Sequence, residues 1–341
     1  MQHYTTRYPR NGQVAILCEG DIAGYESVLL EEWTGRQPGL GLVDVWPCGT
    51  KTAIYGICDA IGRGIPTCVI EDRDSRSQET ADKDCRGNLK DRQERGVDVV
   101  FWRAWQRNEI ENYLVEPCVA YPILAHAFDT TESEVATLLQ ETLRETAIDQ
   151  ALQFTLDEFR ASYPKGEKDV GGVQRSKGRP RWDAGGFVIP ARKTVEELLD
   201  GVLTDSLRRL EPAHRPDNTT FIKMFREKCD EWSEMDIDDV TWRTEWTGKD
   251  ILQWLRFGLS SRYGWPESSD NPTKVSIKWE ALDRKDRGEK DRQIERTLQP
   301  RLAKQFLRVI SPAIPVMTEV AEEWTEIRRE LKNYISSRSA V

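Results

Sequence analysis

The sequence predicts an α/β protein, with a Rossmann-like domain built on a parallel sheet and a mainly α-helical C-terminal domain after it. Two observations support this prediction. Between residue 13 and about residue 116, short apolar runs alternate with segments of helical spacing, which is the pattern of parallel βαβ units. Beyond that point helical periodicity dominates. A chain of 341 residues is long enough for two domains.

Four apolar runs are the expected strands, and they cover residues 13–18, 42–48, 67–72 and 97–102. The first run, QVAILC, lacks polar alternation, as expected of a strand that is covered on both faces. Residues 25–33 and 51–62 have helical spacing, and a glycine turn at Gly49 precedes the second of these helices. In such sheets ligands bind beyond the carboxyl ends of the strands, so a site is expected at that edge.

The chain changes character after Pro117, and we place the domain boundary near residue 125. The predicted domains are therefore residues 1–125 and 126–341. Residues 132–162 should form one or two long helices, and further helices are expected over residues 250–259 and 278–310. We interpret five tryptophans of this half as core and docking surface rather than as base-stacking platforms: Trp232, Trp242, Trp246, Trp254 and Trp279.

Composition excludes several kinds of chemistry. None of the seven cysteines forms a CxxC pair, and the three histidines lie far apart, which argues against a zinc site and a histidine-based triad. Catalysis would have to depend on carboxylates, lysine or a hard metal ion. We expect a cytoplasmic protein, because the sequence contains no run of about 18 apolar residues and no apolar signal core at its N-terminus.

The net charge is −9, yet residues 160–193 hold nine Lys and Arg against three acidic residues and are rich in glycine. One interpretation is a solvated, flexible loop. The other is a loop that contacts phosphates and becomes ordered on binding. The residues expected to contact nucleic acid are Arg175, Lys177, Arg179 and Arg181 of this stretch, together with Lys51 and Arg73 from the first domain.

Acidic residues follow three of the four predicted strands. They are Glu19 and Asp21 after the first strand, Asp72 and Asp74 after the third, and Glu109 and Glu111 after the fourth. Side chains at the carboxyl ends of parallel strands project into one crevice, so these groups are expected to converge. Asp72 and Asp74 are two residues apart and would point the same way in an extended backbone.

Converging carboxylates repel one another unless a cation neutralises them, and their oxygens suit Mg²⁺ or Mn²⁺. Such an ion can activate water and stabilise a displaced phosphodiester. Local alternatives exist for two of the motifs. Asp21 could cap the helix that follows it, and Asn108 with Glu111 fits a capping box.

Together these motifs resemble the Toprim domain, which is shared by topoisomerases, bacterial primases, RNase M5-like enzymes and the OLD nucleases. The resemblance is carried by Glu19-Gly20, Gly49 and Asp72-Arg73-Asp74, each of which follows a predicted strand. The segment EIENYLVEP, residues 109–117, is similar to the OLD-like branch, including the Toprim effector of the PARIS phage-defence system. The similarity covers about residues 13–120.

This resemblance implies a Mg²⁺-dependent endonuclease that hydrolyses DNA or RNA, with tRNA among the candidate substrates. Glu19 would be a metal ligand or general acid/base, and Asp72 and Asp74 would hold Mg²⁺. Glu109 or Glu111 would complete a second ion site or order the first.

One departure puts the second metal site in doubt. Related sequences often carry an acidic residue four positions after the first glutamate, where this chain has Ala23. Asp21 or Glu26 would have to substitute. The alternative function is a non-catalytic, Toprim-derived binding or regulatory module, and a primase or topoisomerase is a weaker third interpretation.

The resemblance also bears on partners. The sequence contains no Walker A motif, so any ATPase that controls the protein would be a separate chain. We expect the toxic effector of an antiphage defence system, active as a homodimer formed through residues after 125.

Overall fold

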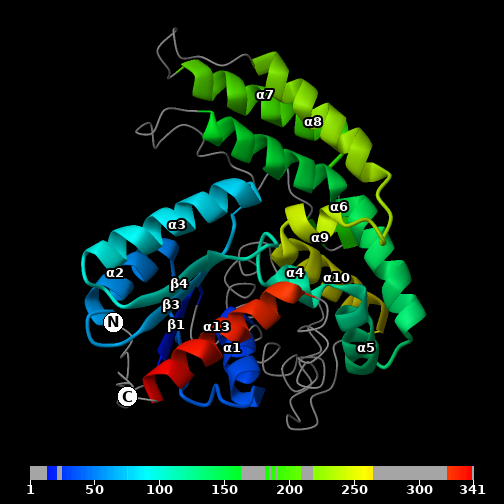
Figure 1. The fold of residues 1–341 in the computed structure, drawn as a ribbon. Helices are drawn as coiled ribbons and strands as arrows, with labels where there is room; N and C mark the ends of the chain where they lie inside the picture. The colour runs from blue at the N-terminus through cyan, green and yellow to red at the C-terminus, as the bar shows by residue number, and fades with distance from the viewer. Residues whose placement is uncertain are drawn as a thin grey trace. The chain divides into compact units, whose positions relative to one another are not determined.

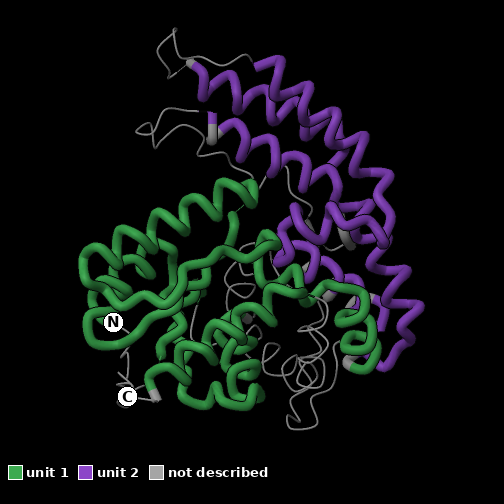
Figure 2. Tube along the Cα trace, viewed as in Figure 1, with its two compact units in different colours: residues 1–127, 283–341 green, residues 128–282 purple. Residues whose placement is uncertain are grey.

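The computed structural model describes residues 14–20, 25–74, 76–162, 181–183, 186–188, 190–208, 218–263 and 321–339. The chain divides into two compact units (Figure 2). Unit 1 comprises Met1–Ala127 and Asp283–Val341, and unit 2 comprises Phe128–Leu282. The division after Ala127 lies close to the predicted boundary. The C-terminal segment, which we had assigned to the second domain, belongs instead to the first.

Unit 1 contains a four-stranded parallel sheet, which confirms the predicted α/β class. The strands are β1 (Val14–Cys18), β2 (Val43–Pro47), β3 (Thr67–Glu71) and β4 (Val99–Ala104). Their order is β2-β1-β3-β4, so β1 and β3 lie side by side in the middle. Every residue of β1 and β3 is buried, as expected for strands that are covered on both faces.

Two helices pack against one face of this sheet. They are α2 (Lys51–Ile61) and α3 (Gln78–Glu94), whose buried side chains form a core with alternate residues of the strands. Leu17 and Val69 point into this core from β1 and β3, and Ile54 and Cys85 point into it from the helices. Successive strand residues face opposite sides, so the residues between them face the other layer.

The opposite layer includes α1 (Tyr25–Arg36) and the C-terminal helix α13 (Glu322–Ser339) (Figure 1). Trp324 of α13 contacts Trp33 of α1 and stacks on Trp105 after β4, with ring centroids 5.3 and 5.0 Å apart. Arg103 of β4 forms ion pairs with Glu326 and Glu330. These contacts explain why the last helix belongs to unit 1. Between β4 and unit 2 the chain forms α4 (Glu111–Leu114) and α5 (Pro117–Phe128).

Unit 2 is mainly helical in its described part. Its helices are α6 (Glu132–Ala161), α7 (Arg192–Arg208), α8 (Asn218–Ser233), α9 (Thr241–Glu245) and α10 (Gly248–Tyr263). Residues 132–161 form one helix, and α10 contains the helix predicted over residues 250–259. The tryptophans interpreted as core are buried wherever they are described: Trp232, Trp242, Trp246 and Trp254.

The structure differs from the predicted basic loop in one respect. A short antiparallel hairpin, β5 (Arg181–Asp183) with β6 (Gly186–Val188), lies within it. The helix predicted over residues 278–310, with Trp279, lies outside the described residues. No helix in the described part of the chain combines the length and the apolar character needed to cross a membrane.

Candidate functional site

Two glycines that follow β1 and β2 form a backbone bridge, which sets the positions of the residues next to it. Gly20 and Gly49 form a reciprocal backbone bridge, with N–O distances of 3.2 and 2.9 Å. Both have positive φ, 82° and 83°, which glycine adopts without the strain that a Cβ would impose. The bridge sets Glu19 at the end of β1 close to the start of α2, where Thr50 caps the helix and Lys51 is its first residue.

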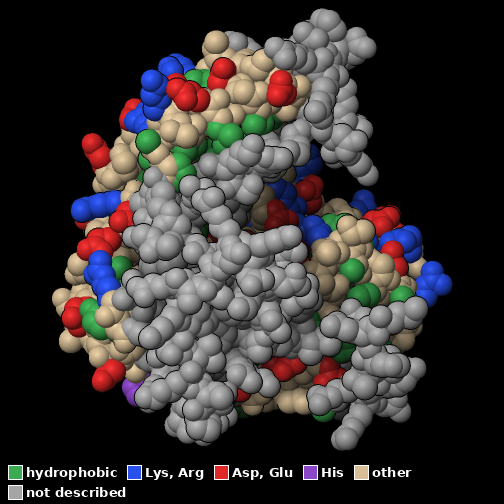
Figure 3. Space-filling model, turned by 180° about the vertical axis from the view of Figure 1, so that it is seen from behind, with side chains coloured by type: hydrophobic (Ala, Val, Ile, Leu, Met, Phe, Trp, Pro, Cys, Tyr) green, Lys and Arg blue, Asp and Glu red, His purple; other side chains and the backbone are tan. Residues whose placement is uncertain are grey.

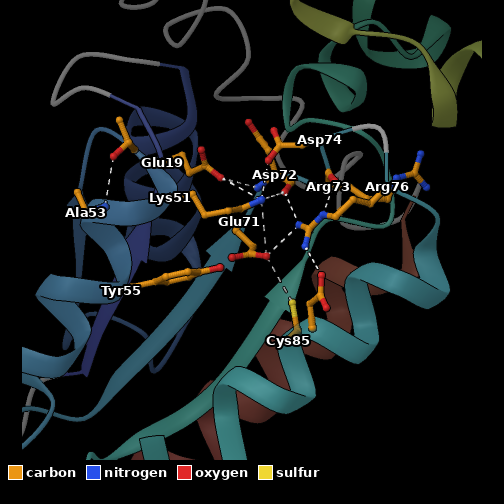
Figure 4. A network of polar contacts seen from close by, with 12 residues as sticks. Glu19, Lys51, Ala53, Tyr55, Glu71, Asp72, Arg73, Asp74, Arg76 and Cys85 are labelled. Carbon is orange, nitrogen blue, oxygen red and sulfur yellow. Dashed lines mark hydrogen bonds and ion pairs between the residues drawn. The ribbon is translucent and has the colours of Figure 1, made fainter. Parts of the chain in front are cut away.

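Glu19 and Asp72 meet at the carboxyl ends of the neighbouring strands β1 and β3 (Figure 4). The backbone N–H of Asp72 donates to Glu19 Oε1 at 3.2 Å. The pKa of Glu19 is raised from 4.5 to about 7, because the carboxyl group is buried and because Asp72 and Asp74 repel its charge. Attraction by Lys51 opposes this shift without cancelling it. Asp72 and Asp74 therefore lie near enough to Glu19 for their charges to act on it.

The ammonium group of Lys51 lies among these acidic groups. It donates to Asp74 Oδ2 at 2.5 Å and to the Asp72 carbonyl at 3.0 Å, and it lies 4.0 Å from Glu19 Oε1. Burial acts to lower the pKa of Lys51, but the hydrogen bond to Asp74 and the charges of Glu71 and Asp74 outweigh it and raise the pKa. Lys51 was predicted as a contact for nucleic acid, and the structure places it inside the acidic cluster.

Glu71 is a member of this cluster that the sequence analysis missed. It is the last residue of β3, and its side chain is fully buried. Its Oε1 accepts from Arg76 at 2.9 Å and lies 3.8 Å from Lys51 Nζ, while its Oε2 accepts from Trp102 Nε1 at 3.3 Å. A buried carboxylate is normally paired in this way. The only sequence signal was the position of Glu71 directly before Asp72 at the end of an apolar run.

Asp72 and Asp74 do not share the extended geometry that we predicted for them. The strand ends at Glu71, and Asp74 has a φ of 52° in a turn. Asp72 is buried, whereas the side chain of Asp74 is 56% exposed. The two side chains therefore lie at different depths, because the turn rather than strand alternation directs Asp74.

Arg73, between them, is turned inward. It is buried, its guanidinium donates to the Gln106 carbonyl at 3.2 Å, and its amide donates to the Asn108 carbonyl at 2.9 Å. These bonds join the end of β3 to the loop after β4. This position favours a structural role for Arg73 over the predicted contact with nucleic acid.

Glu109 and Glu111 lie on that loop and on α4. The N–H of Glu109 is bound by the Asn112 side chain at 2.9 Å, and Glu111 is buried at the start of the helix. The capping box considered for Asn108 and Glu111 does not form. The N-cap residue of the helix is Ile110, and it makes no side-chain cap hydrogen bond. The loop adjoins the end of β3 through Arg73.

Several predicted residues cannot be placed. Asp21, Ala23, Arg175, Lys177 and Arg179 lie outside the described residues, and the side chain of Arg181 on β5 is not described. Glu26, the substitute considered for Ala23, is buried in the first turn of α1, where its Oε2 is 4.0 Å from the position of a Cβ on Gly20. On the face shown in Figure 3, described basic side chains are interspersed with acidic ones rather than gathered in one patch.

The donor chemistry of the cluster fits a hard divalent cation. Glu19, Asp72 and Asp74 offer carboxylate oxygens only, the ligands that Mg²⁺ and Mn²⁺ prefer. Burial and repulsion by Asp72 and Asp74 raise the pKa of Glu19, and a cation would relieve the repulsion. Within the described residues, however, no three His, Cys, Asp or Glu side chains are already gathered into a metal-binding group. Binding would require the side chains around Lys51 to rearrange.

Comparison with known proteins adds no relative. No family model, no curated protein and no solved structure matches this chain.

Proposed function

We propose that this chain is a metal-dependent nuclease that hydrolyses phosphodiester bonds of DNA or RNA at the carboxyl ends of β1 and β3. The observation that carries the proposal is the placement of Glu19 and Asp74 around the Lys51 ammonium, at 4.0 and 2.5 Å from it, next to Asp72 after the end of β3. Glu19, Asp72 and Asp74 would hold the cation. When bound, Mg²⁺ or Mn²⁺ would supply an activated water and charge stabilisation at the phosphate.

The roles of the surrounding side chains follow from their contacts. Glu19, beside the Asp72 amide and the Lys51 ammonium, would act as a ligand of the cation or as a general acid/base for the attacking water. Lys51 is the cation at the mouth of the cluster and is suited to contact a phosphate oxygen. Glu71 holds Arg76 and lies beside Lys51, so it would position both cations without touching substrate.

The motif resemblance to the OLD-like Toprim branch supports the same reaction. On that basis we also propose an antiphage effector that is controlled by a separate ATPase and active as a homodimer. The described tryptophans of unit 2 give no support to a dimer interface, since they are already buried in the single chain. The basic residues 160–193 remain the proposed contact with nucleic acid, together with Lys51.

The test is to incubate the purified chain with plasmid DNA and with total tRNA, in Mg²⁺, Mn²⁺ or EDTA. We expect cleavage of at least one substrate with metal and none in EDTA. Glu19→Gln should abolish cleavage without unfolding the chain. Its melting temperature in EDTA should equal or exceed that of the wild type, because the substitution removes a repelled charge and keeps an acceptor for the Asp72 amide.

The matched control for this variant is Glu32→Gln on α1. The side chain of Glu32 is 42% exposed and pairs only with Arg36 among the ion pairs of the described residues. This variant should cut like the wild type. Full activity of Glu19→Gln would remove Glu19 from the catalytic machinery.

A non-catalytic binding module is the second candidate, and one observation favours it. The Lys51 ammonium already compensates part of the acidic charge, as it would in a site that no longer uses a metal. In that case nucleic acid would bind to the chain in EDTA and in Mg²⁺ alike, and neither condition would give cleavage.

A further inference from the structure

Lys51 is the side chain that contacts several members of the acidic cluster. Its ammonium bonds to Asp74 at 2.5 Å and to the carbonyl of Asp72 at 3.0 Å, with Glu19 Oε1 at 4.0 Å (Figure 4). These are the oxygens and residues that would face a cation. A bound cation and the ammonium would therefore compete for the same carboxylates.

Glu71 does not depend on Lys51 for its compensating charge. Its Oε1 is 2.9 Å from Arg76 and 3.8 Å from Lys51, and its Oε2 accepts from Trp102. Arg76 is fixed in turn by Asp84 and by the carbonyls of neighbouring residues. If Lys51 moves away, Arg76 still compensates the buried charge of Glu71.

The Lys51–Asp74 pair is also open to solvent. The two side chains are 23% and 56% exposed, and ion pairs in such positions contribute little to stability. The backbone of Lys51, by contrast, is fixed at the start of α2 by the Gly20–Gly49 bridge and the Thr50 cap. The ammonium can therefore move over a short range, while the backbone of Lys51 stays in place beside the cluster.

We propose that Lys51 is an exchangeable cation of this site. When a divalent cation binds to Glu19, Asp72 and Asp74, the ammonium is released from Asp74 and contacts a phosphate oxygen of the substrate. An ammonium has three donors on a flexible stem and suits a phosphate as a point charge. The inference rests on the proposed function, because it assumes that the cluster binds a metal.

The test measures the accessibility of Lys51 directly. The full-length chain is acylated briefly with an amine-reactive ester, and each lysine is quantified by peptide mass spectrometry. Adding Mg²⁺ or Mn²⁺ should raise the labelling of Lys51 by at least threefold. Lys83 and Lys90 on α3 serve as internal controls, since Lys83 is exposed, the Lys90 side chain is 78% exposed, and neither should change.

Two further labelling experiments distinguish the release of Lys51 from other causes of a change in its labelling. In Asp74→Asn, Lys51 has lost the shortest of its ion pairs, so labelling should be higher without metal and rise little when metal is added. A short single-stranded oligonucleotide with non-cleavable phosphorothioate linkages should protect Lys51 again, and only in the presence of metal.

Metal affinity gives an independent readout by calorimetry. Lys51→Met should bind Mn²⁺ several-fold more tightly than the wild type while cleaving more slowly. Lys90→Met removes the same charge from α3 and should leave both quantities unchanged. Metal binding with unchanged labelling of Lys51 would overturn the exchange and leave the nuclease proposal standing. An absence of metal binding in calorimetry and thermal melts would overturn both.

Discussion

The carboxyl group of Glu19 is held at a strand end where burial and two neighbouring carboxylates disfavour its charge. Its pKa is about 7 in the folded chain, against an ordinary value of 4.5. The folded state therefore binds this proton more tightly than the unfolded state does. The stabilising contribution is fully present below about pH 4.5 and is lost as the pH rises through 7.

We therefore predict that the free energy of unfolding depends more strongly on pH in the wild type than in Glu19→Gln. Between pH 5 and pH 8 in EDTA, the wild type should lose about 1 to 2 kcal/mol more than the variant, after allowance for solvent screening. Urea unfolding at the two pH values measures the difference. Parallel pH dependence in the two proteins would contradict the raised pKa of Glu19.

At the level of single residues, sequence reasoning located acidic groups that follow predicted strands. Glu19 and Asp72 converge as expected because the carboxyl ends of parallel strands share one edge. Glu71 was missed because a glutamate that ends an apolar run is normally assigned to the surface. The pairing of Glu71 with Arg76 and Trp102 depends on tertiary contacts that no local pattern contains.

Among the elements, α13 is attached to unit 1 through a buried acidic residue. Glu323 is buried, and its carboxylate accepts from the hydroxyl of Tyr113 and from the amide of Gln106 at 3.0 Å. Burial raises the pKa of Glu323 to about 7 against these two hydrogen bonds. The carbonyl of Gln106 in turn accepts from Arg73, so α13 supports the loop that adjoins the end of β3.

We predict that Tyr113→Phe destabilises unit 1 by about 1 to 3 kcal/mol, because it removes a donor from a buried carboxylate. Tyr334→Phe makes the same chemical change on α13 and serves as the control. Its hydroxyl donates to Asp98 at 3.0 Å, but Asp98 also pairs with Arg338 and lies partly in solvent. Its loss should stay below about 1 kcal/mol. Equal losses in urea unfolding would contradict the role of the buried pair.

Element prediction succeeded where apolar residues are frequent and failed where they are scarce. The strands and α6 follow apolar patterns that the sequence displays directly. Helix α3 was not assigned, because it is largely polar and buries only Ala81, Cys85 and Arg92. The place of α13 in unit 1 was also missed. The charged surface of this helix gave no indication that Trp324 would pack against Trp33 and Trp105.

For the molecule as a whole, unit 1 is built from two separate parts of the chain, residues before 128 and residues after 282. The catalytic residues that we propose all lie in the first part. The second part contributes helix α13, which packs beside β4. Its side chains Trp324, Ile327 and Leu331 are buried. The stability of the site thus depends on a segment more than 200 residues away in sequence from the residues that it contacts, as Arg103 with Glu326 illustrates.

We predict that a chain ending at residue 320 does not form a stable unit 1. Truncation would remove three buried apolar side chains of α13, each worth about 1.5 to 3 kcal/mol, and would expose Trp33 and Trp105. The sum is comparable with the whole stability of a typical domain, which is about 5 to 15 kcal/mol. We expect increased binding of the dye ANS, loss of the cooperative melt of unit 1 and loss of the proposed nuclease activity. A chain ending at Ser339 lacks only two residues and should behave like the full chain. A truncated protein that melts and cuts like the full chain would show that α13 is dispensable for the site.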